Sequence, residues 1–152
     1  MPLERQLQST LNTAQTGERT VRSCSISTLL TRNLQDVFGE NDPTRRRAAI
    51  DEIFTEDCVF YDRNGGVYRA GDEIDRVAGA IKATHPDSPY QPIAEPEELG
   101  NGGRVRWVSG RPGDAPAYAG TDFIIARDGQ IAAVYLFSTN CDSLHPDTPT
   151  AW

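Results

Sequence analysis

The sequence predicts an α+β domain in which three helices, all in the N-terminal half, cover one face of a curved antiparallel or mixed β-sheet. Two observations lead to this prediction. Before residue 84, apolar residues recur at helical spacing in three segments. After residue 90, the chain consists of short segments rich in β-branched and aromatic residues, separated by glycine turns. The expected order of elements is α-α-β-β-α-β-β-β-β.

Two short helices are expected to form a hairpin at the start of the domain. The first can be capped by Ser25 or Ser27 and ends at Gly39. Its single stripe comprises Ile26, Leu29, Leu30, Asn33, Leu34, Val37 and Phe38. The second begins at Asp42-Pro43, because aspartate is a favoured N-cap and proline suits the first helical position. Its apolar face comprises Ala49, Ile50, Ile53 and Phe54.

A short hairpin and a third helix follow. Residues 58–61 (CVFY) predict a strand, and an NGG turn returns the chain through residues 67–69. Gly71-Asp72 opens a helix over residues 73–83, which the sequence HPDSP ends. Residues 91–97 predict a strand at the edge of the sheet, because they contain two prolines. Glycine turns then separate three longer strands, predicted at residues 104–109, 118–126 and 130–139.

The domain is expected to occupy residues 23–140. Residues 1–22 are polar and lack hydrophobic periodicity, which predicts a flexible extension. Residues 141–152 form a polar, proline-bearing tail. We therefore expect one domain between two segments that add nothing to its core.

The charge of the chain restricts its partners. The 152 residues carry a formal net charge of −7, which disfavours nucleic acid and anionic membrane surfaces. Arg45, Arg46 and Arg47 cluster in sequence, and we expect them to form a solvated helix face. No apolar run approaches the roughly 20 residues that span a bilayer. The N-terminal segment also lacks the apolar centre of a secretory signal.

Cysteine and histidine positions predict neither a disulfide framework nor a metal site. Cys24, Cys58 and Cys141 are an odd, dispersed set that is typical of reduced thiols in the cytoplasm. His85 and His145 lie apart from other metal-type ligands. Glycine-rich phosphate loops and nucleophile elbows are absent from the sequence. We therefore expect no cofactor and a cytoplasmic location.

Two stretches resemble a known family. Residues 54–62 (FTEDCVFYD), a glycine-rich turn and residues 68–71 (YRAG) before a helix resemble the first half of SnoaL-like proteins, which belong to the nuclear-transport-factor-2-like (NTF2-like) superfamily. Residues 120–131 (GTDFIIARDGQI) and 134–137 (VYLF) are similar to the last hairpin of that family. The resemblance covers residues 27–139.

The resemblance implies a cone with a largely apolar cavity between the helices and the sheet. It also implies a small apolar or partly polar organic ligand, and a homodimer formed through the outer face of the sheet. The superfamily includes isomerases, cyclases, epoxide hydrolases and non-catalytic binding domains, so the fold alone does not choose among them.

Asp62 is the principal candidate for catalysis. Strand alternation puts Cys58, Phe60 and Asp62 on one face at the end of an apolar strand. Desolvation at an apolar cavity wall raises the pKa of a carboxyl group, which suits a general base. The resemblance also places Asp62 where related ketosteroid isomerases carry their proton-shuttling aspartate. The alternative is that Asp62 only caps the following turn by accepting backbone N–H bonds.

The sequence departs from the isomerase pattern at the groups that stabilise an enolate. The resemblance implies a tyrosine on the first helix and a protonated acid on the penultimate strand. The equivalent positions are Leu34, which donates no hydrogen bond, and Thr121, which is a weak donor. The epoxide-hydrolase pattern of two acids bridged by an arginine also fails, because no acid accompanies Arg104 and Arg106.

Asp122 is the second candidate, because an acid within the segment GTDFII costs free energy unless it is paired or solvated. It could act with Asp62, but an ion pair with Arg104 or Arg106 is the preferred interpretation. Aromatic side chains on the sheet offer apolar area, and two of them a hydrogen-bonding group, although each also suits the core or an interface. The predicted ligand contacts are Phe60, Trp107, Tyr118, Asp122 and Tyr135.

Two functions remain open. One is an isomerase or cyclase that acts on a small apolar carbonyl compound, with Asp62 as general base. The other is a non-catalytic binding or dimerisation module that keeps the cone without its chemistry. A cavity of roughly a few hundred Å³ with Asp62 at its wall favours the first, whereas a cone filled by side chains favours the second.

Overall fold

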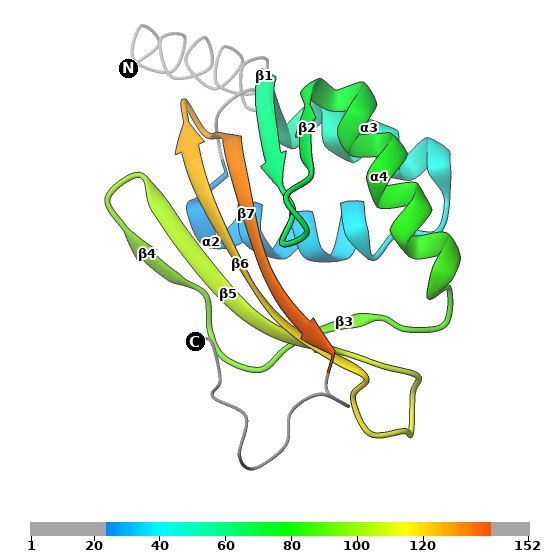
Figure 1. The fold of residues 1–152 in the computed structure, drawn as a ribbon. Coiled ribbons are helices and arrows are strands. Elements are labelled where there is room, and N and C mark those ends of the chain that lie inside the picture. Colours follow the sequence, from blue (N-terminus) through cyan, green and yellow to red (C-terminus); the bar gives the residue numbers. More distant parts are fainter. Residues whose placement is uncertain (1–23, 141–152) are drawn as a thin grey trace, which may run out of the picture.

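The computed structural model describes residues 24–140. The predicted N-terminal extension and C-terminal tail, with Cys141, lie outside the described residues. Within residues 24–140 the helices and strands follow the predicted order, except that one predicted strand is split in two, and the helices lie on one side of a seven-stranded sheet (Figure 1).

The first helix changes its hydrogen-bonding pattern half-way along. α2 (Ile26–Arg32) begins after Ser25, whose side chain accepts a hydrogen bond from the backbone N–H of Thr28. It continues as the π-helical segment η1 (Asn33–Phe38), which ends at Gly39 as predicted. π-Helical turns are rare and are often found at functional sites. Here the segment carries Asn33, a polar residue that is 0% exposed.

α3 (Pro43–Ile53) and α4 (Ala70–Thr84) complete the helical layer. The side chain of Asp42 caps α3 by accepting a hydrogen bond from the backbone N–H of Thr44. Between the two helices, β1 (Phe54–Tyr61) and β2 (Val67–Arg69) form the expected antiparallel hairpin. β1 starts earlier than predicted, because the backbone is already extended at Phe54.

The C-terminal part of the described chain contains five strands where four were predicted. They are β3 (Tyr90–Pro92), β4 (Glu97–Leu99), β5 (Gly102–Ser109), β6 (Tyr118–Arg127) and β7 (Gln130–Asn140). The segment predicted as one edge strand is split into β3 and β4, which pair with opposite halves of β5. Pro92 and Pro96 lack the N–H groups that continuous pairing would need.

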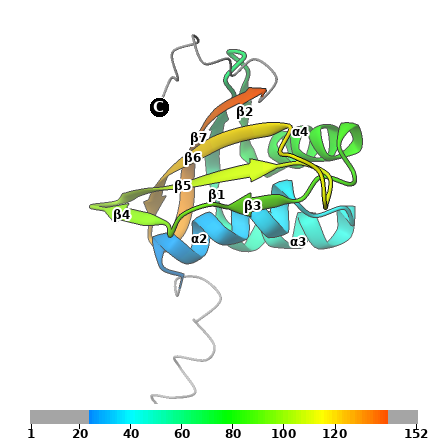
Figure 2. The same ribbon diagram turned by 90° about the horizontal axis from the view of Figure 1, so that it is seen from below.

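The sheet has the order β2-β1-β7-β6-β5-β3, with β4 also paired to β5. β1 and β7 are parallel and the other pairs are antiparallel, so the sheet is mixed. The long strands β5, β6 and β7 curve, and the helices lie on their inner side (Figures 1 and 2). The core fills the space between these two layers, where Leu29, Phe60 and Ile124 are fully buried.

One extra residue in β7 decides which of its side chains point inward. Ala126 pairs with Ile131 and Ile125 pairs with Ala133, so Ala132 has no opposite residue on β6. Ile131 is buried before this bulge, and Val134 is buried after it. Beyond the bulge, every second side chain of β7 counted from Val134 therefore faces inward.

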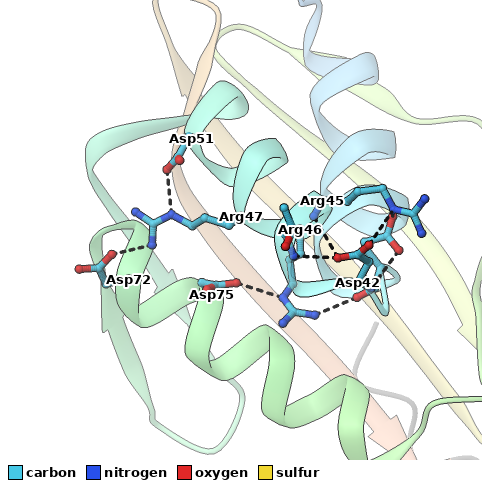
Figure 3. A network of polar contacts seen from close by, with 9 residues as sticks. Asp42, Arg45, Arg46, Arg47, Asp51, Asp72 and Asp75 are labelled. Carbon is cyan, nitrogen blue, oxygen red and sulfur yellow. Dashed lines mark hydrogen bonds and ion pairs between the residues drawn. The ribbon is translucent and has the colours of Figure 1, made fainter.

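The arginine cluster is not a solvated helix face, because α4 packs against α3 and supplies acidic partners (Figure 3). Arg46 is 7% exposed; its Nε donates to Asp75 of α4 (3.1 Å) and its Nη1 donates to the carbonyl oxygen of Glu40 (2.9 Å). Arg47 pairs with Asp72, also on α4. Only Arg45 of the three has the predicted exposure, at 72%.

Replacing Arg46 with alanine should therefore destabilise the protein far more than replacing Arg45. Arg46→Ala leaves Asp75 and the Glu40 carbonyl without their partner, at an expected cost of about 2–4 kcal/mol in the free energy of unfolding. Arg45→Ala removes exposed ion pairs and should cost less than about 1 kcal/mol. Urea unfolding of both variants measures the difference, and equal losses would contradict the structural role of Arg46.

Candidate functional site

A cavity of about 210 Å³ opens between the helical layer and the inner face of the sheet. Its walls come from η1, the end of α4 and strands β1, β3, β5, β6 and β7. Apolar surface is supplied by Leu34, Phe38, Phe60, Ile81 and Leu136. The polar residues on the wall are Asp62, Asn64, His85, Tyr90, Trp107, Ser109, Tyr118, Asp122 and Ser138. The cavity thus combines an apolar lining with several groups that can transfer or share a proton.

Asp122 is the carboxyl group most strongly affected by this environment. It is 4% exposed, and burial raises its pKa to about 6. Hydrogen bonds from Trp107 and Asn33 lower the pKa, but their effect is smaller than that of burial. Trp107 Nε1 donates to Oδ1 at 3.0 Å, and Asn33 Nδ2 donates more weakly to Oδ2 at 3.4 Å. Within residues 24–140 no cationic side chain pairs with it. A carboxyl group that titrates near neutral pH can both accept and return a proton.

Two neighbours make this arrangement possible. Gly120 lies opposite Trp107 on the paired strand, and a Cβ atom at position 120 would come within 2.2 Å of the indole ring. The glycine therefore lets the indole lie across β6 and reach Asp122. The Oδ1 atom of Asn33 is buried without a hydrogen-bond partner among the described residues. If the side-chain amide of Asn33 rotated by a half-turn, its Oδ1 atom could accept the proton of a neutral Asp122.

The preferred prediction for Asp122 was an ion pair across the sheet, and the structure corrects it. Arg104 pairs with Glu97, and both Arg104 and Arg106 lie on the outer face of the sheet. Thr121, expected to occupy the position of the second acid, also faces outward. Because successive residues of a strand point to opposite faces, Asp122 is the residue of β6 that enters the cavity.

Asp62 lies at the cavity wall, as the alternation of Cys58, Phe60 and Asp62 predicts. The following turn is closed by the backbone of Asp62: its N–H donates to the carbonyl oxygen of Gly66 (2.9 Å), and its carbonyl accepts from the N–H of Gly65 (3.0 Å). None of the hydrogen bonds between described residues uses the Asp62 carboxylate to cap this turn. Its assignment as general base stays a prediction.

The two carboxyl groups approach the cavity from strands on either side of β7. Asp122 lies opposite Leu136, and Asp62 follows Tyr61, which lies opposite Tyr135. Two strand spacings separate β1 from β6, or roughly 10 Å. A small ligand between the strands can therefore contact both groups.

Of the aromatic residues predicted to contact a ligand, Phe60, Trp107 and Tyr118 line the cavity. Tyr135 does not, because the bulge at Ala132 turns it to the outer face, where it stacks on Tyr61 at 4.8 Å. The prediction of a cavity position for Tyr135 is therefore wrong.

The structure brings to the site residues that the sequence did not single out as functional. Tyr90 of β3 packs edge-on against Trp107, and burial together with the charge of Asp122 raises its pKa to about 12. His85, at the end of α4, contacts Tyr118 through a 2.7 Å hydrogen bond. Asn33 could have been found from its place in the apolar stripe of the first helix, where a buried amide needs a polar partner.

Residues 24–140 contain no group of three or more histidine, cysteine or acidic side chains that could hold a metal ion. None of the helices described is long and apolar enough to cross a membrane.

No family model and no curated protein matches this sequence. Solved structures match its fold. A proposed isomerase of the SnoaL-like family from Agrobacterium tumefaciens is 22% identical, with a TM-score of 0.69 over 76% of this chain and 97% of that one. A proposed polyketide cyclase from Sinorhizobium meliloti is 22% identical, with a TM-score of 0.56 over 72% of this chain and 93% of its own. An NTF2-like protein of unknown function from Mesorhizobium loti is 22% identical, with a TM-score of 0.56 over 75% of this chain and 91% of its own. The chain therefore has the NTF2-like α+β cone fold.

Asp122 should make the protein less stable as the pH rises. Its pKa of about 6 in the folded protein exceeds the value of about 3.9 for an unfolded chain, so the folded state binds the proton more tightly. The resulting stabilisation is complete below about pH 4 and is lost as the pH rises through the folded value. Two pKa units correspond to about 3 kcal/mol.

Asparagine at position 122 does not titrate, so Asp122→Asn should gain about 2–3 kcal/mol relative to the wild type between about pH 4 and pH 7. Urea unfolding of both proteins across this range measures the change. Parallel pH dependences would show that Asp122 is not desolvated.

Proposed function

We propose that the protein binds a small, largely apolar carbonyl compound in this cavity and moves a proton within it, as an isomerase or cyclase does. The observation that carries the proposal is Asp122, a buried carboxyl group at the cavity wall whose pKa is raised to about 6. A base with this pKa accepts a proton at neutral pH and releases it again without a large penalty.

The local contacts of Asp122 support an acid–base role over a structural one. An internal ion pair would hold the carboxylate permanently charged, but the two groups that contact it, Trp107 and Asn33, are neutral donors. They hold the carboxyl group in place while the remaining lone pairs are free to face the cavity. Burying a carboxyl group without a cation costs stability, and such costs are typical of functional sites.

Asp62 is the second acid–base candidate in this proposal. It lies on the same cavity wall, and its carboxylate is not used to close the adjacent turn. Two carboxyl groups in different environments can take opposite roles in one reaction. We assign the proton transfer at carbon to Asp122, because its environment is the more strongly desolvated, and keep Asp62 as the alternative base.

A binding module without catalysis is the competing function, and one residue favours it. Leu34 lines the cavity where the resemblance implies a tyrosine that would stabilise an enolate. A cavity that binds but does not react would need neither that donor nor a base. The experiment below separates the two functions.

Hydrogen–deuterium exchange of small ketones tests the proposal directly. Cyclic ketones and enones are incubated with the protein in D₂O, and proton NMR follows the loss of the hydrogens α to the carbonyl. The wild type should accelerate this exchange. Asp122→Asn should slow it by at least about 100-fold, because an amide cannot take the proton, while ligand affinity changes by only a few fold.

The matched control is Thr121→Val, which alters the neighbouring residue on the opposite face of β6 and should exchange as the wild type does. Asp62→Asn, run in parallel, tests the alternative base. Ligand binding without exchange in the wild type would identify the binding module. Full exchange in both aspartate variants would rule out acid–base roles for these residues.

We also propose that a second copy of the chain covers the outer face of the sheet. This face carries a groove lined by Thr121, Phe123, Ile125, Tyr135 and Phe137, with Glu97, Arg104 and Arg106 beside it. Phe137 is 55% exposed. An apolar patch with charged residues of both signs at its rim suits a self-complementary interface.

Light scattering at micromolar concentration should give the mass of a dimer for the wild type and of a monomer for Phe137→Glu, because a buried, unpaired carboxylate opposes association. Leu99→Glu is the control, since Leu99 is also an exposed apolar residue but lies outside the groove. A monomeric wild type would exclude the dimer.

A further inference from the structure

At the end of the cavity formed by α4 and the start of β6, three side chains form a hydrogen-bonded chain. Thr84 Oγ1 lies 2.7 Å from His85 Nδ1, and His85 Nε2 lies 2.7 Å from Tyr118 Oη. The imidazole and phenol rings meet edge to face, with centroids 4.8 Å apart. His85 and Tyr118 both line the cavity, although 33 residues separate them in sequence.

The direction of each hydrogen bond follows from the number of protons available. Thr84 Oγ1 donates its one proton to the carbonyl oxygen of Ile81 at 2.7 Å. It must therefore accept from His85, which puts a proton on Nδ1. In the neutral ring Nε2 is then bare, and it accepts the hydroxyl proton of Tyr118. The lone pairs of the Tyr118 oxygen are left for a partner in the cavity.

When His85 gains a second proton, the hydrogen bond between its Nε2 atom and Tyr118 Oη reverses direction. Thr84 still fixes Nδ1–H, and Nε2–H now donates to Tyr118, so the tyrosine hydroxyl is free to donate into the cavity. The pair therefore presents an acceptor to a ligand hydroxyl when the ring is neutral and a donor to a ligand carbonyl when the ring is charged. The other titratable side chains on the cavity wall are Asp62, which follows β1, Tyr90 of β3 and Asp122 of β6.

We propose that Tyr118 and His85 form a proton relay that holds the oxygen atom of the ligand, with Tyr118 in contact with that oxygen and His85 acting through Tyr118. This inference rests on the function proposed above, and it supplies the oxygen-side donor that Leu34 cannot provide. Tyr118 is then a catalytic residue, and His85 is a positioning residue and proton source.

The relay completes a balanced enolisation. The Asp122 carboxylate takes a proton from carbon as the C–H bond breaks, and the electron pair moves through the conjugated system to the carbonyl oxygen. That oxygen takes the hydroxyl proton of Tyr118, which is replaced from Nε2–H of the His85 imidazolium. The products are an enol, a neutral Asp122 and a neutral His85, and no further reactant is needed. Reversal at a different carbon gives an isomer.

The positions of the two groups define the class of substrate. Tyr118 and Asp122 are four residues apart on the same face of β6, so roughly 13 Å separates their backbone positions. A ligand in contact with both is elongated along the strand, with its oxygen at the Tyr118 end and a reactive C–H toward Asp122. Between them the walls are apolar, formed by residues such as Phe60 and Leu136. An extended, conjugated enone or enol fits this description.

Binding of 2-naphthol and naphthalene tests the oxygen site without any turnover. The two probes differ only in one hydroxyl group, which the neutral relay should accept. The wild type should bind 2-naphthol about five- to tenfold more tightly than naphthalene, as one hydrogen bond predicts. Tyr118→Phe should abolish this preference. Tyr135→Phe, which removes a hydroxyl from the outer face, should keep it.

Exchange kinetics then test the relay in catalysis. Tyr118→Phe and His85→Phe should each lower kcat for α-hydrogen exchange about 10- to 100-fold, and the double variant should lose little more, because the residues act as one unit. His85→Phe should leave KM within a few fold of the wild type, because Tyr118 still contacts the ligand oxygen. A merely structural histidine would disturb the cavity and change KM as well.

The two experiments separate this inference from the function on which it rests. Equal affinity of the wild type for the two probes, or a preference that survives Tyr118→Phe, overturns the oxygen site. Full exchange in both relay variants, with exchange lost in Asp122→Asn, overturns the relay but leaves the proposed function intact. Loss of the probe preference in Tyr118→Phe without any exchange in the wild type keeps the oxygen site and removes the enolisation.

Discussion

The alternation of side chains along β6 and β7 decides what the cavity can do, and in β7 a single extra residue sets which side chains face inward. The bulge at Ala132 changes the parity of β7, so that Leu136 faces the cavity while Tyr135 leaves it. Because neighbouring strands share their faces, Asp122, opposite Leu136, enters the cavity with it. Without the bulge, the inner wall opposite the helices would carry a different set of residues.

The burial of Asp122 is the main energetic cost of this arrangement. Water would stabilise the carboxylate better than two neutral donors do, which is why its pKa rises. Part of that cost is offset by the indole of Trp107, which reaches the carboxylate only because position 120 is a glycine. The same cost makes the group useful, since a carboxylate stabilised by an ion pair would be a weak base.

The helical layer holds the opposite wall of the cavity. η1 brings Asn33 to Asp122 and Leu34 to the cavity wall, so one segment contributes both a hydrogen-bond donor and apolar surface. The packing of α3 against α4 is stabilised by Arg46, whose guanidinium group bonds to both Asp75 and the Glu40 carbonyl. α4 in turn ends at His85, so the position of the relay depends on a contact that is remote from the cavity.

The sequence by itself determined the order of the helices and of most strands, the cap at Asp42, and the inward face shared by Phe60 and Asp62. These features depend on residues close together in the chain, so hydrophobic periodicity and capping chemistry are sufficient to find them.

Only the tertiary structure decided the rest of the site. Asp122, expected to pair across the sheet, faces the cavity because it shares a face of β6 with the buried Ile124, and the packing of the layers decides which face of the strand the helices cover. His85 meets Tyr118, and Arg46 meets Asp75, across sequence separations of 33 and 29 residues. Such contacts follow from how the layers pack, and the packing is a property of the whole chain.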